Sequence, residues 1–142
     1  MKKIYTDSFI FSLLVFFSCS TDFLKSYDKR IIGTWELRDI NTTGFGGNAD
    51  NLPFREGQFI FNADGTMTYT NASGTIYQGQ WDIVKKNIDG ENVYRSLLVS
   101  VTDFSAQHTL TEYYDDMNFR STDHFVAKVV SGWYTYITHF RR

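Results

Sequence analysis

The clearest chemistry in the sequence belongs to Cys19, the only cysteine among the 142 residues. Lys2 and Lys3 stand near the start, an apolar run covers residues 9–17, and Ser18 directly precedes the cysteine. A basic start, a short apolar core and a small residue before a cysteine are typical of a signal peptide that ends in lipid attachment to the thiol. Since no second cysteine can form a disulfide, acylation also explains a single thiol in a secreted chain.

The apolar run is about half of the ~20 residues that a membrane-spanning helix needs, so it predicts a cleaved signal instead of a permanent span. We expect residues 1–18 to be a lipoprotein signal peptide and residues 19–30 to be the lipidated cysteine and a polar tether. Ser20 follows the cysteine, which resembles the default for outer-membrane lipoproteins. The predicted location is therefore the outer membrane, on its periplasmic or surface face. A plain secretory peptide with an incidental cysteine is the alternative.

The three histidines could in principle bind a metal ion. His124 and His139 are expected to face each other in the last hairpin, with His108 on the preceding strand. A catalytic zinc site needs three protein ligands and an open position, and these histidines fall on the expected solvent face without a carboxylate beside them. We therefore predict no metal and no cofactor.

The carboxylates do not form a recognisable catalytic pair. Glycosidase-like chemistry needs two carboxylates facing one cleft, whereas Glu36, Asp82 and Glu112 are expected to point outward or have an uncertain register. Asp115-Asp116 reads as a solvated turn. The sequence also lacks a Ser-His-Asp or Cys-His arrangement and a glycine loop before a helix. It predicts a protein that is not an enzyme, although an inhibitor or a hydrolase using unrecognised residues stays open.

Composition limits the class of partner. Without residues 1–18, which hold Lys2, Lys3 and Asp7, 12 basic and 15 acidic residues remain, a net charge of −3. No basic stripe is present, so nucleic acid is not an expected partner. The 13 Phe, 9 Tyr and 3 Trp, with a single Pro, favour β-strands over helices and over disorder. About 115 residues remain after the tether, which suits one domain.

The chain after residue 30 alternates between apolar and polar side chains, with glycine or Asx turns between the segments. This pattern predicts a loop at residues 115–122 and eight strands, at residues 31–41, 58–62, 66–71, 76–84, 93–102, 106–114, 124–130 and 133–140. Ile40 breaks the alternation of the first strand and predicts a bulge nearby.

Hairpin registers follow from keeping apolar side chains on one face. A three-residue loop that ends in a left-handed Gly65 pairs Phe61 with Met67 and Phe59 with Tyr69. A similar loop at residues 72–74 then pairs Tyr69 with Tyr77 and Met67 with Gly79, which marks a bend or makes room for bulky neighbours. In the last hairpin, a two-residue loop at residues 131–132 pairs Phe125 with Thr138, Ala127 with Tyr136 and Val129 with Tyr134.

Eight antiparallel strands joined by short turns form an up-and-down meander. Closing the meander into a barrel removes both exposed edges. We therefore predict an all-β, eight-stranded barrel over residues 31–142, with a two-sheet β-sandwich as the alternative.

Three segments of this meander resemble the lipocalin-like lipoproteins of Bacteroides-type bacteria. They are Ile32-Gly33-Thr34-Trp35-Glu36-Leu37, then residues 59–66, which read Phe-Ile-Phe-Asn-Ala-Asp-Gly-Thr, and residues 79–83, which read Gly-Gln-Trp-Asp-Ile. The resemblance covers roughly residues 31–142. It implies that Trp35 closes one end of the barrel and that Arg141 or Arg142 packs on it, and it implies a ligand at the open mouth.

Two functions are expected from this reading. The first is an outer-membrane-anchored barrel that binds a small apolar or amphipathic ligand beneath the long connection between the first two strands, residues 42–57. The second is a solid-core interaction or structural module of the cell envelope, because large side chains can fill an eight-stranded barrel. The candidate ligand-binding residues are Trp35, Phe45, Leu52, Phe54, Tyr69, Tyr77, Trp81 and Tyr136.

Overall fold

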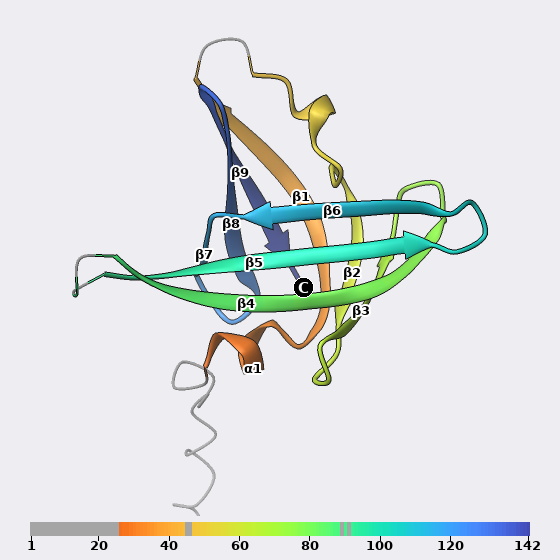
Figure 1. Ribbon diagram of the computed structural model, residues 1–142, viewed down its shortest axis with the longest axis horizontal. Helices are drawn as coiled ribbons and strands as arrows, with labels where there is room; N and C mark the ends of the chain where they lie inside the picture. The colour runs from red at the N-terminus through yellow and green to blue at the C-terminus, as the bar shows by residue number, and fades with distance from the viewer. Residues whose placement is uncertain (1–25, 45–46, 89, 91) are drawn as a thin grey trace, which may run out of the picture.

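A computed structural model of the chain describes residues 26–44, 47–88, 90 and 92–142 (Figure 1). The predicted signal peptide, Cys19 and Phe45 lie outside these residues. The elements are α1 (Tyr27–Ile31), β1 (Gly33–Thr43), the 3-10 turn η2 (Ala49–Asn51), β2 (Gly57–Phe61), β3 (Thr66–Thr70), β4 (Ile76–Ile88), β5 (Asn92–Asp103), β6 (His108–Tyr114), β7 (Asp116–Phe119), β8 (His124–Ser131) and β9 (Tyr134–Arg141).

All strands belong to one antiparallel sheet that curls into a nearly closed barrel. The strand order is β6-β5-β4-β3-β2-β1-β9-β8-β7, so the first and last strands of the chain pair with each other. The two ends of the sheet, β6 and β7, are consecutive in the chain and separated only by Asp115. The predicted all-β antiparallel meander is confirmed, while α1 occupies part of the segment that we expected to be tether and takes Ile31 out of the first strand.

The prediction of eight strands was wrong, because residues 116–119 of the predicted loop form β7. The chain bends at Asp115 and changes partner, from β5 before the bend to β8 after it. Three hydrogen bonds hold the bend: Asp115 N donates to Lys128 O (2.7 Å), Asp115 Oδ2 accepts from Val130 N (2.8 Å) and Asp115 O accepts from Ser96 Oγ (3.0 Å). The aspartate pair therefore marks a change of partner strand instead of a solvated turn.

Both central hairpins have the predicted registers. Phe61 pairs with Met67 and Phe59 with Tyr69, and Gly65 in the connecting loop is left-handed with φ +83°. Tyr69 pairs with Tyr77 in the next hairpin. The predicted bulge near Ile40 is also confirmed, since the register of β1 against β9 shifts between Leu37 and Asp39.

The predicted register of the last hairpin was wrong by two residues. Its loop is Gly132-Trp133, and Phe125 pairs with Phe140 instead of Thr138. This register lets the two phenylalanine rings stack at 4.4 Å with an angle of 8° between their planes. Because side chains alternate with a period of two, a two-residue shift leaves each residue on its predicted face.

The barrel interior is filled with side chains. Gly79 faces inward where β4 and β5 lie so close together that a Cβ at this position would be 1.9 Å from Ser100 O. Of the two roles predicted for it, the glycine therefore allows the bend and does not make room for a bulky side chain. The largest fully buried side chains are Trp35, Tyr114, Phe54, Phe59, Phe61, Phe125, Phe140, Ile31, Met67, Leu97, Val99 and Val101.

α1 lies at one end of the barrel (Figure 1), and the buried Trp35 closes that end by its contact with α1. Trp35 is fully buried, donates from Nε1 to Ile31 O at 2.6 Å and meets Phe125 edge to face at 4.7 Å. Of the two arginines expected to pack on this ring, Arg142 does so, with its guanidinium 4.2 Å from the ring centre. Arg142 also donates to Arg30 O at 2.6 Å, which ties the last residue to α1.

Candidate functional site

The opposite end of the barrel is the mouth, where β1 ends, β2 begins and the long connection between them crosses over (Figure 1). Residues 48–56 of this connection are called the plug here. Leu52 and Phe54 point into the barrel and are 8% and 1% exposed. Phe54 packs edge to face against Phe59 (5.4 Å) and Tyr69 (4.9 Å). The plug therefore fills the space that an open barrel would leave at its mouth.

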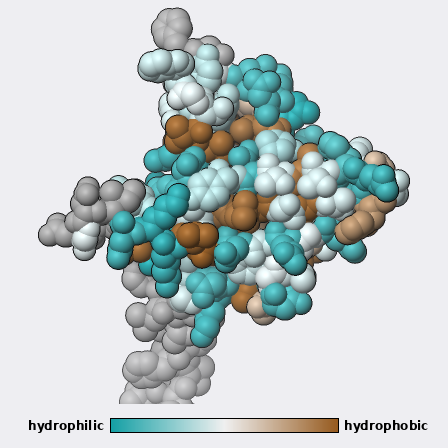
Figure 2. All heavy atoms as spheres, in the orientation of Figure 1, coloured by the Kyte–Doolittle hydropathy of each residue, from teal (hydrophilic) through white to brown (hydrophobic). Residues whose placement is uncertain are grey.

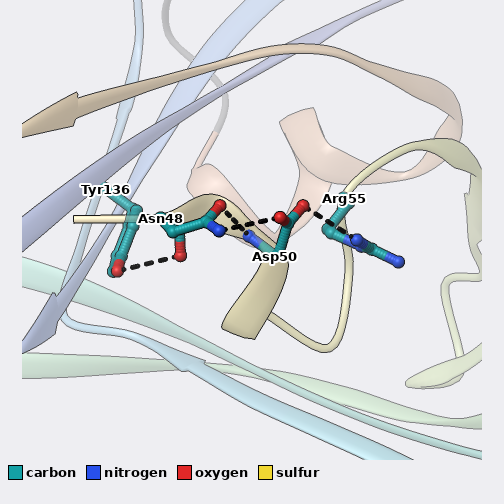
Figure 3. Close-up of polar contacts among 4 residues, drawn as sticks. All are labelled: Asn48, Asp50, Arg55 and Tyr136. Carbon is teal, nitrogen blue, oxygen red and sulfur yellow. Dashed lines mark hydrogen bonds and ion pairs between the residues drawn. The ribbon is translucent and has the colours of Figure 1, made fainter. Parts of the chain in front are cut away.

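The plug is held together by its own polar groups (Figure 3). Asn48 Oδ1 accepts from Asp50 N (2.9 Å), and Asn48 Nδ2 donates to Asp50 Oδ2 (2.8 Å). Arg55 Nη1 donates to Asp50 Oδ1 at 3.0 Å. These contacts, Asn48 first and Arg55 second, lower the pKa of the Asp50 carboxyl. The Asn48 amide also caps the 3-10 turn η2, whose closing bond runs from Leu52 N to Ala49 O (3.0 Å).

Two tyrosines of the barrel wall donate hydrogen bonds to the backbone of the plug. Tyr69 Oη donates to Glu56 O at 2.7 Å, and Tyr136 Oη donates to Asn48 O at 3.3 Å (Figure 3). Burial, followed by the nearby Glu56 carboxylate, raises the pKa of Tyr69 to about 12. The two hydroxyls that could orient a ligand at the mouth thus hold the two ends of the plug.

A cleft of about 360 Å³ lies beside the plug, between it, the β3–β4 turn and the start of β6. Its wall combines aromatic rings with polar groups, and the Tyr77 and His108 rings meet edge to face at 6.3 Å. The lining residues are Pro53, Arg55, Glu56, Tyr69, Asn71, Ala72, Ser73, Tyr77, His108 and Leu110. A few polar groups beside aromatic surface are what a small-molecule site requires.

The inner face of β6 carries two polar groups that the sequence pattern did not place inside. Glu112 pairs with the buried Val99, so it shares the inner face, and burial raises its pKa. The prediction of an outward or undecided Glu112 is thereby corrected. Tyr114 is 1% exposed, and its hydroxyl has no hydrogen-bond partner among the described residues. Burial, then Glu112 and Tyr69, raises the pKa of Tyr114 well above its usual value.

The predicted ligand-binding residues divide between the two ends of the barrel. Tyr69, Tyr77 and Tyr136 line the mouth, and Leu52 and Phe54 belong to the plug. Trp35 lies at the closed end, and Trp81 lies near the β2–β3 turn, where its Nε1 donates to Asn62 O at 3.0 Å. Phe45 is outside the described residues. The sequence pattern considered His108 only as a metal ligand and had no signal for Arg55 or Tyr114. His108 and Tyr114 meet rings from other strands, and Arg55 pairs with Asp50 inside an irregular loop.

The histidines do not gather into one site. His124 Nε2 and His139 Nδ1 lie 3.3 Å apart on the outer face, and Asn41 Nδ2 is 2.9 Å from His139 Nε2. Burial, then Arg141, lowers the pKa of His124. His108 instead lines the mouth cleft. Within the described ranges, no three His, Cys, Asp or Glu side chains come together to hold a metal ion.

Comparison with known proteins found no matching family model, no matching curated protein and no matching solved structure. The class of the protein is therefore described by its geometry alone, a nearly closed antiparallel β-barrel with a plugged mouth. Any proposal about function has to start from that geometry. In the part of the chain that the structure describes, no helix is long and apolar enough to cross a membrane.

Proposed function

We propose that the chain is a non-enzymatic, lipocalin-like lipoprotein of the outer membrane that binds a small apolar or amphipathic ligand at the barrel mouth. The observation that carries the proposal is the cleft of about 360 Å³ beside the plug. Its rings, Tyr77 and His108, offer apolar faces, while Arg55, Glu56 and Asn71 offer hydrogen-bonding groups. Sites of this kind orient a ligand by a few polar contacts and bind it by apolar burial.

We further propose that the lipid expected on Cys19 sets the direction in which the mouth opens. α1 begins only a few residues after Cys19 and packs on the closed end of the barrel, where Tyr27 meets Phe119 at 5.1 Å. A lipid at Cys19, close to α1 in the sequence, would hold the closed end toward the bilayer and leave the mouth toward the aqueous side. A ligand reaches the cleft from solution and not through the membrane in which the lipid is held.

Native mass spectrometry of the full chain, purified from its own host, tests the proposal. We expect a bound small molecule at one per chain, which is lost in a Tyr77→Ala variant because the flat wall of the cleft is gone. Tyr94→Ala is the matched control, since Tyr94 is 41% exposed on the outer face. A wild-type chain that carries no adduct under these conditions contradicts ligand binding.

The second candidate function, an interaction module of the envelope, is favoured by exposed rings at the mouth end. Trp133, in the β8–β9 turn, is 92% exposed, and Phe104, after β5, is 73% exposed. Apolar side chains reach the surface in Figure 2 as separate patches among polar ones. Crosslinking in cells with the wild type and with Trp133→Ser tests this candidate: a partner that depends on Trp133 supports it, and an identical crosslinking pattern opposes it.

A further inference from the structure

We infer that the plug occupies space that the ligand takes when it binds, so that binding displaces residues 48–56 from the mouth. The ligand is an apolar chain that ends in an uncharged hydrogen-bond acceptor. This inference rests on the proposed function and adds what the ligand is and what it must move. It places the ligand in the space now held by Leu52 and Phe54, beneath the cleft already described.

The first step is that the plug can move as one body. Its polar contacts join Asn48, Asp50 and Arg55 to one another (Figure 3). Its turn closes with a hydrogen bond from Leu52 N to Ala49 O. Among the described residues, the plug pairs with no strand of the sheet. A segment that satisfies its own polar groups keeps them satisfied after it leaves the barrel, so its displacement does not expose unpaired backbone groups there.

The second step is that few contacts hold the plug in place. The hydrogen bonds from the barrel wall to the plug are those of Tyr69 and Tyr136, within the described part of the chain. The rest of its apolar attachment is the burial of Leu52 and Phe54, with the partly buried Ala49 packed against the core. A ligand that buries about eleven apolar carbons, as the Leu52 and Phe54 side chains do, recovers the same hydrophobic stabilisation.

The third step concerns the polar end of the ligand. Displacement frees the Tyr69 and Tyr136 hydroxyls, and the buried Tyr114 hydroxyl already lacks an acceptor. Tyr114 belongs to the same aromatic cluster as the plug, since its ring lies 6.0 Å from Phe140, which meets Phe59 at 5.2 Å, which in turn meets Phe54. A buried donor without a partner is costly, so an acceptor on the ligand removes a defect of the plugged state.

The charges around this space select the head group. Glu112 lies on the inner face of β6 and stays there when the plug leaves, so a negatively charged head meets a carboxyl group. A positively charged head cannot accept the tyrosine hydrogen bonds. A carbonyl or ether oxygen satisfies the donors without either conflict, which makes the ligand a neutral amphiphile.

The experiment follows tryptic cleavage after Arg55 in the full-length chain carrying Cys19→Ser, with 2-decanone as the probe. Saturation-transfer NMR measures binding, and mass spectrometry follows cleavage. We expect the ketone to bind at least about tenfold more tightly than decyltrimethylammonium, which has no acceptor. We also expect cleavage after Arg55 to accelerate about tenfold or more when the plug leaves, while cleavage after Arg38 in β1 stays unchanged.

A variant that loosens the plug without touching the barrel interior gives an independent test. Asp50→Ala removes the exposed ion pair to Arg55, and we expect ketone binding to tighten about two- to fivefold because the plug competes less well. Glu36→Ala is the matched control, since it breaks an exposed ion pair to Arg38 (2.7 Å) on β1. Equal affinities in Asp50→Ala and wild type overturn the displacement.

The outcomes separate this inference from the proposed function. Ketone binding without faster cleavage after Arg55 places the ligand on the closed plug; the displacement is then wrong and the mouth still binds. Failure to bind the ketone overturns the inferred ligand class, while the native mass spectrum decides ligand binding by itself. Ketone binding together with faster cleavage supports both.

Discussion

Gly79 is a residue at which the barrel tolerates no side chain. A Cβ at this position would lie 1.9 Å from Ser100 O and 2.7 Å from Val101 Cα, both backbone atoms of the paired strand. Relief would require β4 and β5 to separate, which breaks ladder hydrogen bonds of the two longest strands. The curvature of the barrel thus depends on the absence of one methyl group.

We predict that Gly79→Ala lowers the free energy of unfolding by about 3 kcal/mol or more, measured by urea denaturation with tryptophan fluorescence. Gly74→Ala is the control, because a Cβ there meets nothing within 4 Å although φ is +84°. The left-handed backbone alone costs about 1 kcal/mol. Similar losses in the two variants would show that the close approach of β4 and β5 does not matter.

Tyr69 gives the fold a pH dependence in the alkaline range. Its pKa is about 12 in the fold and about 10 in an unfolded chain. The folded state therefore holds the phenol proton more tightly, so this contribution to stability is complete below pH 10 and is lost as the pH rises toward 12.

We predict that raising the pH from 9 to 11 lowers the free energy of unfolding of the wild type by about 1 kcal/mol more than that of the Tyr69→Phe variant. Urea titrations at the two pH values measure the difference. Tyr94→Phe, at an exposed position of the outer face, should behave like the wild type. A wild-type loss no larger than that of Tyr69→Phe would mean that the buried phenol does not resist ionisation.

Among the elements, the bent strand formed by β6 and β7 carries the closure of the barrel. Asp115, at its bend, supplies two hydrogen bonds to β8 in place of regular strand pairing. Its N–H donates to Lys128 O, and its carboxylate accepts from Val130 N. Asp116, the next residue, makes only a long ion pair to Lys128 at 4.0 Å. The two adjacent aspartates therefore contribute differently to the stability of the barrel.

We predict that Asp115→Ala lowers the unfolding free energy by about 1–3 kcal/mol, because Val130 N loses its acceptor. Asp116→Ala should change it by less than about 0.5 kcal/mol, as expected for an exposed pair. Thermal or urea unfolding of the two variants measures both values. Equal effects would place the closure elsewhere in the sheet.

The sequence alone was sufficient to predict the register of strands whose pairing depends on local geometry. Phe59 through Tyr77 could be placed in register because a left-handed Gly65 and strict alternation leave one arrangement that keeps apolar side chains together. For the last hairpin, the face of each residue was predicted correctly but the pairing was not, because Ser131, Gly132 and Trp133 allow more than one turn. The stacking of Phe125 on Phe140, which decides between them, is a tertiary contact.

The site was less predictable than the fold because its parts meet only in three dimensions. Leu52 and Phe54 were recognised as candidates from the length of their loop, but nothing local shows that they enter the barrel. Tyr69 and Tyr136 were recognised as candidate polar groups, yet their partners are backbone oxygens of a loop without sequence pattern. Tyr114 lies at the end of a predicted strand, where burial cannot be inferred from alternation.

At the scale of the whole molecule, the barrel has a closed pole and a plugged pole. Trp35, α1 and Arg142 close the first, and the plug fills the second. α1, the first described element after the proposed lipid site, packs at the closed pole and not at the mouth. Loss of the lipid should therefore change the location of the protein without changing the barrel.

We predict that Cys19→Ser moves the protein from the membrane fraction to the soluble fraction and abolishes its labelling by radioactive palmitate. The Tm of the barrel should stay unchanged, because the core of the described residues is built from side chains between Ile31 and Phe140. Fractionation, labelling and thermal unfolding of both proteins measure these effects. An unlabelled wild type in the soluble fraction would remove the outer-membrane location and leave the barrel as described.

Arg142 donates from its backbone to Asp123 O at 3.1 Å and from its side chain to Arg30 O, so Arg142 lies against α1. A short flexible linker from Arg142 to Tyr27 would join them, and new termini fit at the open β3–β4 turn. In such a circular permutant, β9 and β1 become neighbours in sequence. The pairing of Glu36 with Arg141 would then form early, and stopped-flow refolding should be faster because the loop to be closed is short.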